Sequence, residues 1–236
     1  IDPILDSPGV GQNLRDHPGV KIIWDAKSGI ELDTLGPRTQ VCLRYKADGS
    51  RLDNDMMIFM ATAIPSSFKT GGARDETPAL GAGLYLYLAQ GKGELKLKSN
   101  DYREHPYVDF NYLVETEDLR RMRDGVRMVV EMEKHPAMSS LIAKRLQPMG
   151  SDLESDDALD NWLKREAHTG HHISCTAKMG PETDPMAVVD QVGNVHGVDQ
   201  LRVADASIMP DCIRANTNAT VMMIGERISD FITHEQ

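Results

Sequence analysis

Between residues 19 and 109 the sequence alternates short apolar segments with segments rich in glycine, proline, aspartate and serine. Nearly continuous apolar runs, which are typical of strands covered on both faces, occupy residues 20–26, 56–64 and 83–88. In residues 41–45 and 94–98, apolar and polar side chains alternate, which indicates strands with one face in solvent. Turn-forming segments, notably residues 65–82 and 98–106, separate these strands. This pattern predicts one mainly antiparallel sheet.

Helical periodicity follows the strand region. Residues 115–135 repeat apolar side chains at the spacing of one helix face, with arginine and glutamate on the opposite face. The predicted buried stripe consists of Leu119, Met122, Val126, Val129 and Val130. Pro136 ends this helix because proline has no backbone N–H for the next helical hydrogen bond. Ser155 before two aspartates is typical of an N-cap, and predicts a second helix to about Glu166.

Two further elements are predicted near the end of the printed sequence. Leu201–Val203 reads as a short strand. A last helix is predicted from Thr217 or Asn218 to Thr233, with one apolar side formed by Val221, Ile224, Ile228 and Phe231. Together with the sheet, these helices predict an α+β fold, a mainly antiparallel sheet with flanking helices.

Charge and composition exclude some classes of protein. A net charge of −10 without a cluster of lysine and arginine argues against a nucleic-acid partner. No apolar run reaches the roughly 20 residues that a membrane-spanning helix needs. The three widely spaced cysteines form no disulfide pattern, so we expect free thiols and a cytoplasmic location. The opening Ile-Asp-Pro holds neither a methionine nor a signal segment, so we expect part of a longer protein.

The glycines at the start of the sequence do not form a dinucleotide fingerprint. Gly9 and Gly11 match the first two glycines of GxGxxG, but Leu14 occupies the third position, and neither a preceding strand nor a βαβ unit is predicted. Three prolines in residues 1–18 favour an irregular connection. We therefore expect the two glycines to permit close approach of another backbone segment.

Three histidines fall within five positions, at His168, His171 and His172. One interpretation is a zinc site, which in its simplest form would belong to a hydrolase, but no cysteine or carboxylate accompanies the histidines at a ligand spacing. A second interpretation is a set of surface histidines. A third is one working general base, which histidine provides more often than any other side chain. We expect no metal and favour the third interpretation.

Two polar segments close to the last helix are also candidates. Asp205 and Ala206 directly follow the predicted strand, where α/β folds place ligands, although Asp205 would equally serve to cap a turn. Asn216, Thr217 and Asn218 stand at the predicted helix start, where capping alone would explain them. The positive end of that helix would also stabilise an anionic group.

Three stretches resemble one known family. Residues 8–18 (PGVGQNLRDHP), residues 172–180 (HISCTAKMG) and residues 188–226 are similar, in this order, to motifs of the glucose–methanol–choline (GMC) flavoprotein oxidoreductases. The resemblance extends over essentially the whole chain. Residues 221–227 (VMMIGER) look most like the choline dehydrogenase and choline oxidase branch.

The resemblance implies a division into domains. Residues 1–18 and 168–236 would belong to an FAD-binding α/β domain, and residues 19–167 would form the substrate-binding domain. The family's GxGxxG motif is not in this sequence, so the N-terminal half of the same protein would be a partner, and the chain alone would bind FAD weakly or not at all. The oligomeric state is left open, with a homo-oligomer as one alternative.

The resemblance also assigns roles to single residues. His172 aligns with the active-site base and Asn216 with its partner position. Residues implied to lie along FAD are Asp205 and Ala206 at the pyrophosphate, Asn216 and Thr217 at the isoalloxazine ring, and Asn13 and His17 in a nearby loop. The family's HPxGT motif is changed here, because Ile173 and Cys175 replace its proline and glycine.

The implied reaction is the oxidation of a small-molecule alcohol to an aldehyde or ketone, with hydride transfer to flavin N5. Choline would require an aromatic cage for its quaternary ammonium group. The candidate aromatic residues are Trp24, Phe59, Tyr85 and Tyr87, but core packing is the better interpretation for each. We therefore favour a generic alcohol over choline. The alternative from another class is an isolated domain that folds alone, binds no FAD and catalyses nothing.

Overall fold

The structure is a computed structural model, and it describes residues 5–33, 35–64 and 79–234. These residues divide into two compact units. We call the described parts of residues 18–87 and 113–168 the sheet unit, and those of residues 1–17, 88–112 and 169–236 the loop unit. No helix in the described ranges is both long and apolar enough to cross a membrane. Whether the units correspond to substrate-binding and FAD-binding domains stays a prediction.

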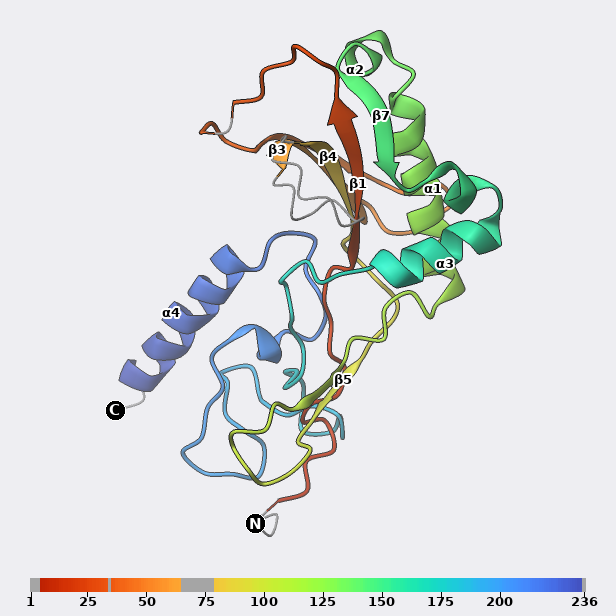
Figure 1. Ribbon diagram of the computed structural model, residues 1–236. Helices are drawn as coiled ribbons and strands as arrows, with labels where there is room; N and C mark the ends of the chain where they lie inside the picture. The colour runs from red at the N-terminus through yellow and green to blue at the C-terminus, as the bar shows by residue number, and fades with distance from the viewer. Residues whose placement is uncertain (1–4, 34, 65–78, 235–236) are drawn as a thin grey trace. The chain divides into compact units, whose positions relative to one another are not determined.

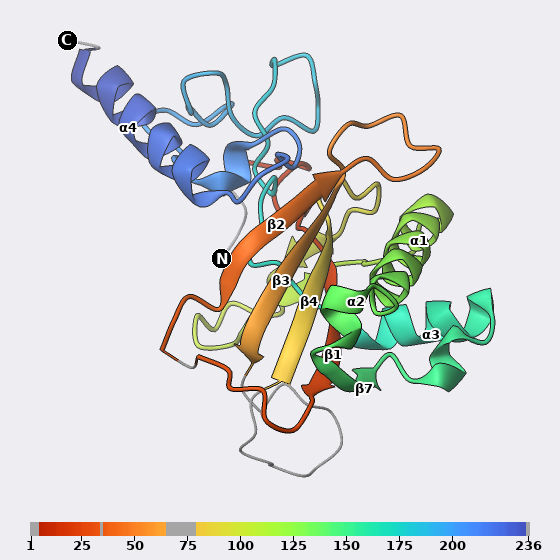
Figure 2. The ribbon, with the colours of Figure 1, turned by 90° about the horizontal axis from the view of Figure 1, so that it is seen from above.

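The sheet unit is built on a five-stranded antiparallel sheet with the order β2-β3-β4-β1-β7 (Figure 1 and Figure 2; β2 is labelled in Figure 2). The strands are β1 (Gly19–Ala26), β2 (Thr39–Tyr45), β3 (Met56–Ile64), β4 (Ala79–Leu86) and β7 (Ile142–Gln147). The predicted mainly antiparallel sheet is confirmed. The predicted turn-forming segment 65–82 lies outside the described residues as far as position 78, and from position 79 it is strand β4.

The side chains of the central strands are more buried than those of the edge strand β2. The central strands β1 and β4 are mostly buried, in agreement with their continuous apolar runs. Strand β2, at one edge of the sheet, was predicted to have one covered face, but nearly all of it is exposed. Strand β7, at the other edge, was not predicted, because its sequence IAKRLQ lacks an apolar run or a regular alternation.

The helices of the sheet unit lie on one side of the sheet (Figure 2). They are α1 (Thr116–Met132), the short α2 (Pro136–Ser139) and α3 (Asp156–Glu166). Helix α1 packs against β4 and α3 against β1. The predicted N-cap is confirmed, since the Ser155 side chain accepts a hydrogen bond from the backbone N–H of Ala158 at 3.1 Å. In the predicted stripe of α1, only Val130 is less than fully buried.

One arginine of α1 corrects the prediction that the arginines of this helix lie on an exposed face. Arg121 is buried, and its guanidinium donates to Asp55 at 3.0 Å and to Asp118 at 2.5 Å, two carboxylates that are also buried. Asp55 in turn accepts from the Ala47 N–H at 2.9 Å. A helical hydrophobic pattern does not reveal such a charge network, because Asp55 comes from a different part of the sequence and the pattern does not distinguish Asp118, three residues before Arg121, from an exposed aspartate.

The loop unit has little regular structure apart from helix α4 (Asn218–His234) and a two-stranded sheet of β5 (Glu94–Lys96) and β6 (Tyr107–Asp109). The predicted last helix is confirmed, and its Ile224 and Ile228 join a buried cluster with Val188, Val189, Ile208 and Met209. The strand predicted over residues 94–98 belongs to the small sheet rather than the large one, and Leu97 lies beyond it, 84% exposed.

The strand predicted at Leu201–Val203 is wrong. Only Arg202 forms a bridge, to Asn194. Backbone bonds from Val195 to Leu201 and from Val203 to Gly193 flank that bridge, and Gly193 has a positive φ of 82°. The pairing is therefore limited to one bridge with a backbone hydrogen bond on each side, and the sequence Leu-Arg-Val does not indicate how far a pairing extends.

The buried charge network generates a prediction about stability. Replacing Arg121 with methionine leaves Asp55 and Asp118 buried without their cation, so we expect a loss of about 3–5 kcal/mol in the free energy of unfolding. The matched control is Arg120→Met on the same helix, because Arg120 pairs with Glu117 and Asp124 near the surface and should contribute about 0–1 kcal/mol. Urea denaturation of the intact protein measures both, and equal losses would contradict the prediction.

Candidate active site

The two glycines of the first motif bring backbone segments of the loop unit together. A Cβ atom on Gly9 would lie 2.3 Å from the carbonyl oxygen of Met186, and one on Gly11 would lie 2.1 Å from that of Leu95. Gly11 also has a positive φ of 77°, which favours glycine. The prediction that these glycines permit close backbone approach is confirmed.

The residues after Gly11 run between two other segments. On one side, Arg15 and Ser174 exchange both backbone hydrogen bonds, at 3.0 and 2.9 Å. On the other side, Leu14 and Gly93 do the same, at 3.0 and 2.9 Å. Residues 14–17 are therefore held in the middle of the loop unit, next to the segment that contains His172.

A buried carboxylate fixes the histidine motif at this point. Asp16 is 4% exposed, and its Oδ1 accepts hydrogen bonds from the backbone N–H of His17 at 2.7 Å and of His172 at 3.0 Å. Its Oδ2 accepts a short hydrogen bond from the Tyr112 hydroxyl. Burial and the bond to Asp16 raise the pKa of Tyr112, so its hydroxyl stays protonated and remains a donor. Sequence reasoning had assigned no role to Asp16 or Tyr112.

The side chains of His17 and His172 are in direct contact. Their Nδ1 atoms lie 2.8 Å apart, and the two rings meet edge to face at an interplanar angle of 68°. The Nε2 atom of His17 lies 2.8 Å from the carbonyl oxygen of Ile213. His17 is fully buried and His172 is half-buried.

Burial keeps both imidazoles neutral near pH 7. Burial, together with the neighbouring His172, lowers the pKa of His17 to about 4. It also lowers the pKa of His172 below the ordinary value of 6.5, although Asp16 partly opposes this shift. A neutral imidazole has a lone pair on one ring nitrogen, so each of these two side chains has a nitrogen that can accept a hydrogen bond near pH 7.

The other two predicted histidines have contacts of their own. His168 belongs to the sheet unit, where its Nε2 lies 3.5 Å from the Tyr85 hydroxyl. His171 is exposed, and its backbone N–H donates to Thr169. Within the described part of the chain, no three His, Cys, Asp or Glu side chains are arranged to hold a metal ion.

The loop before helix α4 contacts the same segment. Asn13, which has a positive φ of 59°, donates from Nδ2 to the carbonyl of Pro210 at 3.3 Å. Arg15 forms an ion pair with Asp211 at 2.9 Å, and the carbonyl oxygen of Ile213 contacts the Nε2 atom of His17, as described above. Asn216 follows in this loop, exposed, immediately before Thr217 and the helix. The structure therefore brings the loop that contains Asn216 to the segment that contains His17.

The segment that contains Asp205 is hydrogen-bonded to the His172 motif. The Asp205 side chain accepts from the Ser207 N–H at 2.8 Å and caps a short 3-10 turn, Ala206–Ile208, so the capping interpretation is confirmed. The Ala206 carbonyl accepts from the Cys175 N–H at 3.1 Å. Any contact of Asp205 and Ala206 with a cofactor stays a prediction.

The backbone conformation at Cys175 shows why glycine suits this position of the family motif. It has a positive φ of 74°, a conformation in which glycine is unstrained and a side chain is not. The thiol is buried, lies 3.3 Å from the Ser174 hydroxyl, and has a pKa raised to about 11 by burial. The other two cysteines of the chain, Cys42 and Cys212, are also free thiols.

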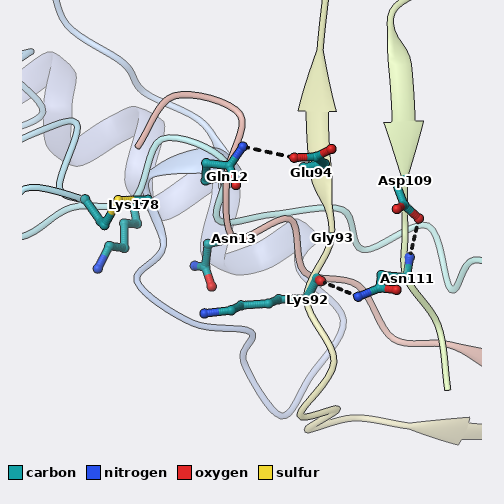
Figure 3. A pocket seen from close by; sticks show the side chains of 9 residues that line it. Gln12, Asn13, Lys92, Gly93, Glu94, Asp109, Asn111 and Lys178 are labelled. Atoms are coloured by element: carbon teal, nitrogen blue, oxygen red, sulfur yellow. Dashed lines mark hydrogen bonds between the residues drawn. The ribbon is translucent and has the colours of Figure 1, made fainter. Parts of the chain in front are cut away.

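A polar pocket of about 340 Å³ lies beside this region, within the loop unit (Figure 3). Its lining includes Asn13, the lysines Lys92 and Lys178, and Glu94, which accepts from Gln12 at 3.3 Å. Asn13 is the only predicted site residue among its lining residues, and neither His17 nor His172 lines it. The pocket is therefore not a cavity into which the histidine pair opens.

Comparison with known proteins identifies the class to which this arrangement belongs. Residues 89–225, more than half of the chain, match the family model described as GMC oxidoreductase. The chain therefore belongs to the GMC oxidoreductase family, and the resemblance seen in its motifs is confirmed.

Individual relatives agree with this assignment. An oxygen-dependent choline dehydrogenase from Burkholderia pseudomallei (strain 1710b) is 36% identical over 252 residues, which cover 98% of this chain and 44% of the relative. Among solved structures, pyridoxine 4-oxidase from Mesorbium loti has a TM-score of 0.82 at 22% identity, and covers 99% of this chain and 45% of its own. A variant of formate oxidase from Aspergillus oryzae RIB40 has a TM-score of 0.87 at 22% identity, and the match covers 100% of this chain and 49% of the oxidase chain. This chain thus spans about half the length of its relatives.

The Asp16 contacts generate a second prediction. Tyr112→Phe removes one of the donors to a buried carboxylate, so we expect a loss of about 1.5–3 kcal/mol in the free energy of unfolding. The control is Tyr102→Phe, since Tyr102 is 93% exposed and its hydroxyl should contribute less than about 0.5 kcal/mol. The urea midpoint of each variant is measured in the intact protein. A Tyr112→Phe midpoint equal to that of the control would show that Asp16 does not depend on this bond.

Proposed function

We propose that this chain contributes the active-site base of an FAD-dependent alcohol oxidoreductase, which converts an alcohol to an aldehyde or ketone. The observation that carries the proposal is the half-buried His172 imidazole, held by Asp16 through its backbone and by His17 through its ring. Membership of the GMC oxidoreductase family and the oxidases and dehydrogenases among the relatives support it.

The chemistry of the loop unit fits part of an FAD site. Helix α4 has no acidic residue in its first turn, so the partial positive charge of its N-terminus is not neutralised by its own side chains. Asn216 and Thr217 precede that helix end and would lie along the flavin ring, while Asn13, Asp205 and Ala206 would contact other parts of FAD. The remaining part of the site would come from the N-terminal half of the same protein. Bound FAD would supply the hydride acceptor at N5.

His172 and Asn216 would act on the substrate hydroxyl. Neutral His172 accepts the hydroxyl proton as the oxygen becomes an alkoxide, and the resulting imidazolium stabilises that oxygen by a charge-assisted hydrogen bond. The Asn216 amide donates a hydrogen bond to the same oxygen and does not compete for the proton. Loss of the proton from oxygen and of a hydride from carbon leaves a carbonyl group.

The substrate we favour is a primary or secondary alcohol, with choline as the alternative. Trp24 and Tyr87, two of the aromatic candidates for a cage, are buried in the sheet unit, as the core interpretation predicted. Phe59 and Tyr85 pack edge to face on neighbouring strands, with ring centroids 5.8 Å apart. The choline dehydrogenases among the relatives support the alternative. A cytoplasmic location and a homo-oligomeric state also stay predictions.

The role of His172 is tested in the full-length protein by His172→Ala. We expect flavin reduction by substrate to slow by about 10²–10⁴-fold, because the general base is lost while the residues along FAD are unchanged. Anaerobic stopped-flow absorbance measures the rate, and the flavin spectrum shows that FAD is still bound. His196→Ala is the control, since His196 is a half-buried histidine of the same unit that contacts the Gly180 carbonyl at 3.1 Å. A rate within tenfold of the unchanged protein would refute the role.

The lowered pKa of His172 predicts the direction of the pH dependence. The neutral form is the active base, so the rate of flavin reduction should be constant at high pH and fall as pH decreases through the pKa of His172. Because burial lowers that pKa, we expect the midpoint of the fall below pH 6.5. A midpoint clearly above 6.5, measured by the same stopped-flow method, would contradict a buried neutral base.

A further inference from the structure

We propose that His17 is a positioning residue that fixes the tautomer of His172, with the proton on Nδ1 and the lone pair on Nε2. The inference rests on the proposed role of His172 and names the nitrogen that performs it. His17 would touch neither substrate nor cofactor in this role and would act only through the imidazole of His172.

The tautomer of His17 follows from its contact with Ile213. A carbonyl oxygen only accepts hydrogen bonds, so the Nε2 atom of His17, 2.8 Å away, carries a proton. The pKa of His17, lowered to about 4 by burial, keeps this imidazole neutral, with one ring proton only. The Nδ1 atom of His17 therefore has a lone pair and is an acceptor.

The tautomer of His172 follows in turn. The two Nδ1 atoms are 2.8 Å apart, a hydrogen-bond distance that requires one proton between them. Since His17 Nδ1 has none, the Nδ1–H of His172 donates. The opposite tautomer of His172 would bring two lone pairs together at this distance. Neutral His172 therefore has its lone pair on Nε2, which is the nitrogen that would accept a substrate proton.

The surrounding backbone holds this chain of contacts in place. Asp16 binds the backbone N–H of both histidines, which fixes the two residues relative to each other. Arg15 binds Asp211 at 2.9 Å, two residues before the Ile213 carbonyl that orients His17. Gly170 lies against the pair, and a Cβ atom there would be 2.6 Å from the His17 carbonyl oxygen.

The same contact would stabilise the product of proton transfer. When His172 accepts a second proton on Nε2, its Nδ1–H bond to His17 becomes charge-assisted and therefore stronger. A neutral acceptor is required for this effect, because a second imidazolium would repel the first. The buried and neutral state of His17 meets that requirement.

The experiment determines the tautomer directly in the full-length protein. Uniform ¹⁵N-histidine labelling with long-range ¹H–¹⁵N correlation distinguishes protonated from bare ring nitrogens, and loss of signals in His172→Gln assigns His172. We expect the proton on Nδ1 of His172 in the unchanged protein. In His17→Ala we expect a mixture of tautomers and flavin reduction slower by about 10-fold or more, since part of the base is then protonated on the wrong nitrogen and the imidazolium has lost its acceptor.

A conservative variant separates positioning from packing. In His17→Asn, the side-chain oxygen replaces Nδ1 as acceptor, so we expect the Nδ1–H tautomer of His172 and most of the rate to return. His196→Asn, which removes another carbonyl-bound histidine of the loop unit, should leave both unchanged. A His172 proton on Nε2 in the unchanged protein, or an unaltered tautomer in His17→Ala, would overturn the proposal.

The spectroscopic result also separates this inference from the proposed function. The tautomer is read without turnover, so a change in His17→Ala supports the positioning role even where His172→Ala still reduces flavin at the normal rate. Conversely, an unaltered tautomer overturns the positioning role even where His172→Ala is inactive.

Discussion

The loop unit depends on the buried carboxylate of Asp16. Its two oxygens accept hydrogen bonds from the backbone of His17, the backbone of His172 and the hydroxyl of Tyr112. An unpaired carboxylate in this position would be costly, so the three donors and the carboxylate require one another. Because two of these donors belong to the histidines, the interaction that stabilises the loops also sets the position of the proposed base.

Burial has a second consequence at the same place. It disfavours charge on both imidazoles, which leaves a neutral pair whose hydrogen bonds run in one direction, from His172 through His17 to the Ile213 carbonyl. The close packing of backbone segments in the loop unit requires glycine at Gly11, where φ is positive and the carbonyl of Leu95 is within contact distance. At Cys175 the chain adopts a positive φ without glycine, and there the backbone conformation is strained.

Much of the fold could be predicted from the sequence. The central strands β1 and β3 and the helices α1, α3 and α4 follow from hydrophobic periodicity, which depends only on neighbouring residues. The errors occurred where a partner distant in sequence decides the outcome. Strand β7 forms because β1 offers an edge, and Arg121 is buried because Asp55 reaches it from another part of the sheet unit. The segment Leu201–Val203 forms no strand, since its pairing is limited to the bridge between Arg202 and Asn194.

The sequence alone determined the local elements, the family, and the choice of His172 and Asn216 as candidate residues, because each follows from short motifs. It did not indicate that Asp16 and Tyr112 hold the site together, nor which histidine accompanies His172. The nearest histidine in the sequence, His171, is exposed, whereas His17, 155 positions away from His172, lies within hydrogen-bond distance of it. Only the tertiary structure decides this, since the tautomer of an imidazole is set by the groups that contact its nitrogens in space.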